Sequence, residues 1–314
     1  MAGIVALCGG VGGAKLAYGL ARALPPHELT IVVNTGDDFQ HFGLTICPDV
    51  DTVMYTLSAS ENRDTGWGRA AESWAVMDEV GRLGGETWFK LGDKDLALHL
   101  LRRQLLDRGE RLTSVTREIA ARLGVQSVVL PMSDEPVRTI VETDEGDLAF
   151  QDYFVRLRCE PKVTGFRFEG AVQAKPSPEV AAALSQPGLS GVVICPSNPY
   201  VSIGPMLAVP GIREQLERTP APVLAVSPIV AGRAIKGPAA KMMAELGGPV
   251  SGLQIARLYA NLIDGMLLDE QDRALQQQRR DDDPRLFFAP TVMRTAEDRI
   301  ALARECLRLL QGLR

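Results

Sequence analysis

The opening stretch, residues 3–24 with sequence GIVALCGGVGGAKLAYGLARAL, constrains the fold more than any other part of the chain. Its apolar run, residues 4–7, is too short for a helix core and ends at glycines, which predicts a buried parallel strand followed by a tight turn. Beyond the glycines, apolar residues recur at helical spacing, as at Leu16 and Leu20, until Pro25 ends the pattern. The order of strand, glycine loop and helix predicts an α/β fold with a phosphate-binding unit at its start.

The glycine loop predicts binding of a nucleotide or phosphate, with Gly9, Gly10, Gly12, Gly13 and Lys15 as candidate contacts. Glycines let backbone N–H groups approach a ligand closely, and the helix N-terminus carries partial positive charge. Neither common motif fits. A dinucleotide fingerprint would have a glycine where Lys15 stands, and a P-loop would have Ser or Thr after it. A turn that serves only close helix packing is the alternative.

Acidic residues follow the second predicted strand, residues 29–33, in a segment expected to be a loop over residues 34–48. Ligands of α/β proteins bind beyond the carboxyl ends of the strands, where these acids fall. Asp49 and Asp51, at the start of the next helix, could hold a divalent cation, and one of them could take a proton from an attacking hydroxyl. For Asp49, a role as the cap of that helix is an equal alternative.

Composition excludes several classes of protein. A formal net charge of −5 over 314 residues argues against nonspecific nucleic-acid binding. Five scattered cysteines without CxxC spacing argue against a disulfide framework or a structural zinc site. No apolar run is long enough to cross a membrane, and the first strand begins too early for a signal peptide. We therefore expect a cytoplasmic protein that uses neither nucleic acid nor membrane as a partner.

A helical segment is expected over about residues 58–125, with Trp67 and Trp74 packed inside it. Within it, Lys90 and Lys94 flank the start of a helix and could meet an anionic or carbonyl-bearing ligand. The leucines at 96, 100, 101 and 105 predict the buried face of that helix. His99 is interpreted as a packing or surface residue.

Two further strand ends carry candidate anion-binding residues. The predicted strand at residues 191–195 leads to Ser197 and Asn198, and the one at residues 223–226 leads to a second anion site, for which the candidates are Arg233, Lys236 and Gly237. Before these strands and after the helical segment, about residues 134–172 are expected to form a β-rich insertion with a hairpin turn at 144–147. All of residues 1–314 are expected to form one Rossmann-like domain, with a mostly parallel sheet and helices on both faces.

Six segments together resemble the 2-phospho-L-lactate transferase family, CofD, of deazaflavin coenzyme F-420 biosynthesis. They are GGVGGAKL, VNTGDDFQHFGLTICPDVDTVMYTL, KLGDKD, LPMSDEPVRT, PSNPYVSIGP and SPIVAGRAIKGPAAKMM. The resemblance implies a Rossmann-like fold and transfer of a phospholactyl-type group from a guanosine diphosphate-activated donor. The acceptor would be the ribityl hydroxyl of the deazaflavin Fo, and GMP would be released. The three-carbon acid could be phospholactyl, enolpyruvyl or phosphoglyceryl, and no residue chooses among them.

The resemblance also implies a magnesium (Mg²⁺) requirement and a homodimer. The family's PDxD motif falls on Asp49 and Asp51, which would be catalytic and metal-binding, and Asp51 with Lys90 or Lys94 would contact Fo. The common GGTG loop reads GGVG here, so Val11 removes any hydroxyl contact. The alternative is a YvcK-like regulator that binds a nucleotide sugar without transferring a group. An NAD-dependent oxidoreductase is disfavoured because the glycine fingerprint fails and Asn34 replaces the expected acid.

Overall fold

Strand β1 shows how the sequence builds the central sheet. The computed structural model describes residues 3–313, and β1 spans Ile4–Cys8. Side chains alternate across a strand: Ile4 and Ala6 belong to one hydrophobic cluster, and Val5 and Leu7 belong to another. The strand is therefore buried on both faces, as the all-apolar run predicted.

Seven parallel strands form the sheet in the order β14-β13-β10-β9-β1-β2-β5, which confirms the predicted Rossmann-like class. Besides β1, they are β2 (Leu29–Val33), β5 (Val128–Pro131), β9 (Gly191–Ile194), β10 (Val223–Val226), β13 (Gly265–Asp269) and β14 (Arg285–Ala289). The chain runs outward from β1 to β5, then returns to the other side of β1 at β9. Because the strand order reverses between β1 and β9, the crevice at their carboxyl ends is the expected ligand site.

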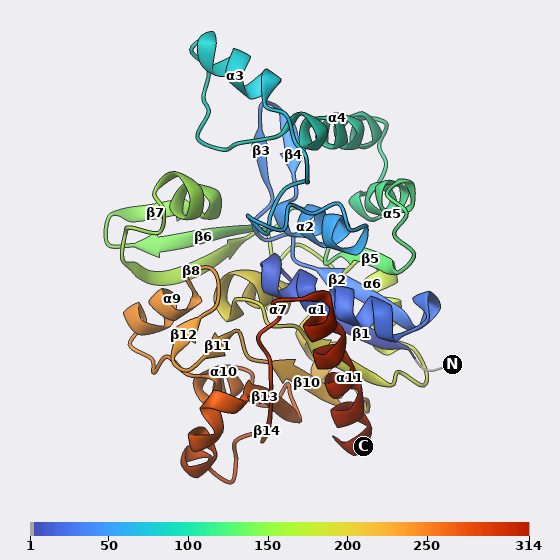
Figure 1. Cartoon of the computed structure of the whole chain (residues 1–314), viewed down its shortest axis with the longest axis vertical. Coiled ribbons are helices and arrows are strands. Elements are labelled where there is room, and N and C mark those ends of the chain that lie inside the picture. The colour runs from blue at the N-terminus through green and yellow to red at the C-terminus, as the bar shows by residue number, and fades with distance from the viewer. Residues whose placement is uncertain (1–2, 314) are drawn as a thin grey trace.

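Helices cover both faces of the sheet (Figure 1). The first cluster includes α1 (Gly10–Ala23), α2 (Pro48–Leu57), α4 (Asp93–Asp107), α5 (Leu112–Arg122) and α11 (Ala296–Leu313). The second includes α6 (Pro178–Ser185), α7 (Gly204–Ala208), α8 (Ile212–Arg218), α9 (Ala239–Glu245) and α10 (Gly252–Leu258). Helix α1 begins at Gly10, earlier than the apolar spacing suggested, because three glycines of the loop form its first turn.

The remaining elements extend from this core. Strands β6 (Arg138–Thr143), β7 (Gly146–Ala149) and β8 (Val163–Glu169) form an antiparallel sheet in the predicted β-rich region. Helix α3 (Ala75–Arg82) lies at the top of Figure 1, away from the central sheet. Short hairpins join β3 (Phe39–His41) to β4 (Leu44–Ile46) and β11 (Ile229–Val230) to β12 (Arg233–Ala234). Single turns of 3₁₀ or π helix occupy Pro26–Glu28, Asp152–Arg156 and Pro199–Ile203, and a longer 3₁₀ helix spans Glu270–Gln278.

Three expectations were wrong. The segment after β2 contains the β3–β4 hairpin, which turns at Phe42 and Gly43, both with positive φ. Trp67 and Trp74 are 48% and 38% exposed instead of packed inside a helical lobe. On α4 the expected apolar face is also wrong in part, because Leu100 is 59% exposed.

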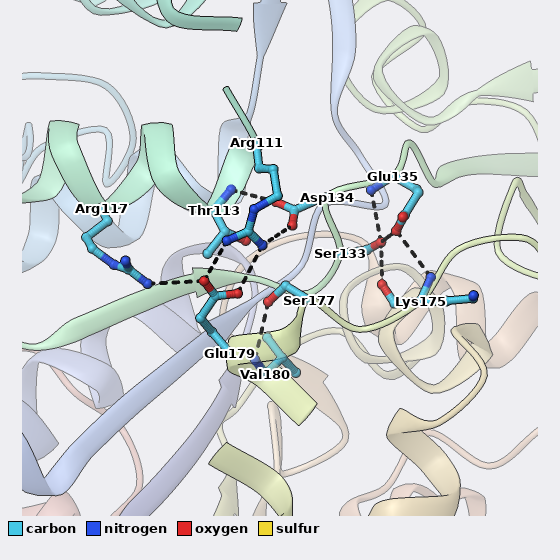
Figure 2. A network of polar contacts seen from close by, with 10 residues as sticks. All are labelled: Arg111, Thr113, Arg117, Ser133, Asp134, Glu135, Lys175, Ser177, Glu179 and Val180. Carbon is cyan, nitrogen blue, oxygen red and sulfur yellow. Dashed lines mark hydrogen bonds and ion pairs between the residues drawn. The ribbon is translucent and has the colours of Figure 1, made fainter. Parts of the chain in front are cut away.

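A polar network fixes the loop that follows β5 (Figure 2). Arg111 pairs with Asp134 and with Glu179 of α6, and the Thr113 N–H donates to Asp134 Oδ1 at 2.7 Å. The Ser133 hydroxyl donates to the Lys175 carbonyl oxygen at 2.7 Å. Exposed ion pairs of this kind contribute little stability individually. Together they fix the loop at the carboxyl end of β5 relative to α5 and α6.

Within residues 3–313, which the structure describes, no helix is both long enough and apolar enough to cross a membrane.

Candidate functional site

A cavity of about 700 Å³ lies where the strand order reverses, at the carboxyl ends of β1 and β9. Segments far apart in the chain line it: the glycine loop, the start of α2, part of α4, and the loops after β9, β10 and β14. Of the predicted site residues, it brings together Gly9, Gly10, Gly12, Lys15, Asp49, Asp51, Lys90, Ser197, Asn198, Lys236 and Gly237. Gly13, Lys94 and Arg233 are not among the residues that line it.

Close approach explains why glycines occupy the loop after β1. A Cβ on Gly9 would lie 2.4 Å from Asp49 Oδ2, and a Cβ on Gly12 would lie 2.4 Å from the Pro196 carbonyl oxygen. Both distances are far inside van der Waals contact, so a side chain at either position would push the neighbouring loops apart. The glycines therefore allow the loop after β9 and the start of α2 to pack directly on α1.

The N-terminus of α1 points two backbone N–H groups at fixed partners. The Gly9 N–H donates to Ser197 Oγ at 3.1 Å, and the Gly10 N–H donates to Asp49 Oδ1 at 2.7 Å. The next two N–H groups, those of Val11 and Gly12, belong to the first helical turn, which offers them no intrahelical acceptor. Both residues line the cavity, so this helix end is suited to bind an anion.

Asp49 does not cap its own helix, although capping was one of its two interpretations. Helix α2 has Pro48 in its first turn and no side-chain cap, and the Asp49 carboxylate instead faces α1. Its second oxygen accepts a hydrogen bond from Asn34 Nδ2 at 3.0 Å, and the same nitrogen donates to Asp37 Oδ1 at 3.1 Å. Asn34 thus holds two buried carboxylates beside the glycine loop.

Burial and mutual repulsion make this acidic pair unusual. Burial raises the pKa of Asp49 to about 6, although hydrogen bonds from Asn34 and Gly10 lower it. Burial, and next the charge of Asp49, raise the pKa of Asp37 well above its usual range. A bound cation would relieve that repulsion, and carboxylate oxygens are the ligands that Mg²⁺ prefers. The pair fits Mg²⁺, which commonly takes one or two carboxylates together with substrate phosphates. Among the described residues, no group of three or more His, Cys, Asp or Glu side chains forms a complete metal site.

Asp51 lies in different surroundings from Asp49. Arg102 of α4 donates hydrogen bonds to both Asp51 oxygens, one of them at 3.1 Å. The Arg102 side chain is 1% exposed and the Asp51 side chain is 7% exposed. His99 lies beside the pair, with its Nδ1 at 3.1 Å from Arg102 Nη1. Burial lowers the pKa of His99 to about 4; Arg102 contributes to the decrease and Asp51 opposes it. The imidazole is neutral near pH 7, and the roles predicted for Asp51 stay predictions.

Basic side chains reach the cavity from three elements. Lys15 Nζ donates to the Met293 carbonyl oxygen at 3.0 Å, and Lys236 Nζ donates to the Thr65 carbonyl oxygen at 3.0 Å. Burial lowers the pKa of Lys15, and the charges of Arg299 and Lys236 add to the decrease. Cations that repel one another in this way favour an anionic ligand between them.

Lys90 and Lys94 differ in position. Lys90 lines the cavity, whereas Lys94 Nζ donates to the carbonyl oxygens of Ala70 and Ala71, at 3.2 and 2.6 Å. Arg233 is exposed on β12. The assignment of Lys94 and Arg233 as ligand contacts therefore stays a prediction that the geometry does not support.

Aromatic side chains form another part of the cavity wall. Phe150 and Phe154 stack with ring centroids 5.4 Å apart and an interplanar angle of 6°, and Phe154 is 40% exposed. Trp67 and Phe89 also line the cavity. Such rings suit a planar aromatic ligand. Sequence reasoning missed these residues because they come from segments interpreted as packing or as a β-rich insertion.

Comparisons with known proteins show the family to which the chain is similar. The family model described as 2-phospho-L-lactate transferase CofD matches residues 4–297. A phosphoenolpyruvate transferase of Streptomyces griseus is 41% identical over 317 residues, covering 99% of each chain. A 2-phospho-L-lactate transferase of Methanosarcina mazei is 40% identical over 271 residues, covering 86% of this chain and 88% of its own.

Among solved structures, a member of the UPF0052 family from Bacillus halodurans has the same fold. Its TM-score is 0.61 at 16% identity, with 97% of this chain and 99% of that chain covered. At this identity the likeness shows the fold alone.

Proposed function

The chain belongs to the 2-phospho-L-lactate transferase CofD family, and on that premise we propose which groups it transfers. As a member, it is a transferase of phosphorus-containing groups in coenzyme F-420 biosynthesis. The proposed donor is a three-carbon acid activated as a guanosine diphosphate derivative, and the proposed acceptor is the ribityl hydroxyl of Fo. The hydroxyl oxygen bonds to the phosphorus that carries the acid, the bond from that phosphorus to GMP breaks, and GMP leaves.

One observation carries the proposal: the N-terminus of α1 and the pair Asp37 and Asp49 meet in one cavity. A diphosphate needs positive charge around its oxygens, which the Val11 and Gly12 N–H groups and two lysines supply. Carboxylates beside a diphosphate need a cation between them. The proposed arrangement satisfies both requirements at one end of the cavity.

Asp37 and Asp49 are the residues that would hold Mg²⁺, with Asn34 fixing their orientation. A bound Mg²⁺ would supply positive charge that neutralises the diphosphate. Lys15 and Lys236 bind the phosphate oxygens, and a carboxylate of the pair orients the attacking hydroxyl or takes its proton. Catalysis in this account is mostly positioning and electrostatic stabilisation.

For the acid we propose enolpyruvyl. The support is that the Streptomyces griseus relative, named a phosphoenolpyruvate transferase, aligns over 99% of both chains. The stacked pair Phe150 and Phe154 is the proposed surface for the deazaflavin ring.

A mass-spectrometric assay tests this function. Purified protein is incubated with Fo, Mg²⁺ and each of three donors, the guanosine diphosphate derivatives of phosphoenolpyruvate, 2-phospholactate and phosphoglycerate. We expect a new deazaflavin phosphodiester whose mass corresponds to the enolpyruvyl group. Absence of product with every donor, in protein shown to be folded, would contradict the transfer and favour a nucleotide-sugar-binding regulator.

A further inference from the structure

His99 on α4 is a buried imidazole whose two nitrogens face different surroundings. The side chain is 2% exposed, and the ring lines the cavity. Its Nδ1 faces Arg102, at 3.1 Å from Nη1. In the part of the chain that the structure describes, no side chain or backbone group forms a hydrogen bond with Nε2.

Arg102 decides which nitrogen carries the proton. A guanidinium group only donates hydrogen bonds, so a proton on Nδ1 would set two N–H donors against each other at 3.1 Å, and the tautomer that lets Nδ1 accept is favoured. The guanidinium is held in place by both oxygens of Asp51. The two hydrogens of Nη1 are shared among Asp51 Oδ2, the Thr45 carbonyl oxygen at 3.2 Å and His99 Nδ1. The proton of the neutral ring therefore lies on Nε2, the nitrogen left to face the cavity.

We propose that His99 donates a hydrogen bond from Nε2 to a carbonyl oxygen of the acceptor substrate, with Arg102 as the positioning residue that fixes the ring. The inference rests on the proposed function and adds to it a residue that selects the acceptor. His99 cannot act as a general base through Nδ1. A neutral donor suits an uncharged carbonyl better than a phosphate. The lysines that suit the phosphates come from other elements, α1 and the loop before α9.

Two conservative variants separate binding from a purely structural role. His99→Asn keeps an oxygen near the position of Nδ1 to accept from Arg102, but its side chain is too short to reach the position of Nε2. His99→Gln reaches that position with an N–H donor. We expect His99→Asn to raise the KM for Fo about tenfold, the effect of one lost hydrogen bond, with the KM for the guanosine donor unchanged. His99→Gln should restore most of that loss. A KM for Fo that is higher in His99→Gln than in His99→Asn, or that is unchanged in both variants, would overturn the proposal.

Nitrogen-15 NMR of the imidazoles tests the tautomer without any substrate. The chain has three histidines, so comparison with His99→Gln identifies the His99 signals. We expect a proton on Nε2 and none on Nδ1 at pH 7. A protonated Nδ1 would overturn the inference even if wild-type protein transfers a group to Fo. Wild-type protein that fails to use Fo would instead overturn the proposed function.

Discussion

The carboxylate of Asp51 accepts two hydrogen bonds from the guanidinium of Arg102, and both side chains are buried. The two residues are 51 positions apart in sequence and join α2 to α4. A buried charge without a partner of opposite sign strongly destabilises a fold, so each residue of this pair compensates the charge of the other. Asp51 is therefore needed first to neutralise Arg102, and a contact with Fo would be a second role.

Replacing Asp51 with Ala should destabilise the fold as well as reduce activity. The substitution leaves the Arg102 guanidinium buried without its partner, a change that typically costs about 3–5 kcal/mol. Urea denaturation of the variant would measure the loss in free energy of unfolding. The double variant Asp51→Ala/Arg102→Leu should recover part of the loss, because no unpaired charge remains. An unchanged free energy of unfolding in the single variant would disprove the structural role of the pair.

Asp49→Asn should lower kcat by about 10²–10³-fold while the protein stays folded. The amide has nearly the shape of the carboxylate but cannot supply the negative charge that holds Mg²⁺. Steady-state kinetics with Fo and varied Mg²⁺ would measure the effect. Asp107→Asn, an exposed acid paired with Arg103 on α4, is the matched control and should behave as wild type. Equal activity of Asp49→Asn and the control would remove Asp49 from the site.

Activity should fall as the pH decreases below about 6, because burial raises the pKa of Asp49 to about 6 and its proton competes with the cation. Higher Mg²⁺ should shift the midpoint of the pH profile to lower pH. A midpoint that does not respond to Mg²⁺ would contradict the assignment.

The raised pKa of Asp49 makes stability change with pH in the direction opposite to activity. A carboxyl whose pKa is higher in the folded state binds protons more tightly there, so its contribution to the free energy of unfolding decreases as pH rises from about 4 to 6. Burial raises the pKa of Asp95 to about 6 as well, which acts in the same direction. His99, whose pKa burial lowers to about 4, acts in the opposite direction over this window, so the net decrease is that of two carboxyl groups against one imidazole. Thermal denaturation without Mg²⁺ should show Tm decreasing over this window, and added Mg²⁺ should reduce the decrease. A Tm that increases over this window in the absence of Mg²⁺ would contradict the expected linkage.

Lys90→Ala should raise the KM for Fo more than Lys94→Ala does. Lys90 lines the cavity, whereas the ammonium group of Lys94 is occupied by the carbonyl oxygens of Ala70 and Ala71. Fo titrations of the two variants compare them directly, with the KM for the guanosine donor as the internal reference. A larger effect at Lys94 would restore its predicted role.

Local patterns made much of the fold predictable. Strand β1, the glycines after it, the hairpin between β6 and β7 and the start of α11 follow from periodicity and turn residues over short windows. The glycine loop indicated where the cavity lies, because the carboxyl ends of parallel strands share one edge of a sheet. What the pattern could not give was the start of α1 at Gly10, because glycine is a poor helix former and gives no helical signal.

Long-range pairing accounts for what the sequence did not predict. The spacing of leucines on α4 predicted a buried Leu100, but the buried face carries Arg102 and His99. The arginine can be buried because Asp51 on α2 compensates its charge. The sequence left capping of α2 and a functional role as equal interpretations of Asp49, and only the approach of α1 shows that its carboxylate accepts from the Gly10 N–H. Such pairings depend on the tertiary arrangement, so no local sequence pattern predicts them.

The most direct test of the account is the amount of GMP released per Fo consumed, measured with the guanosine diphosphate derivative of phosphoenolpyruvate as donor. We predict one GMP for each deazaflavin phosphodiester formed, with release that requires both Fo and Mg²⁺ and that Asp49→Asn slows by the same about 10²–10³-fold. Two results would contradict the claim that the protein transfers a phosphorus-containing group to the deazaflavin in this cavity. One is GMP release that proceeds equally without Fo, and the other is no release by folded wild-type protein.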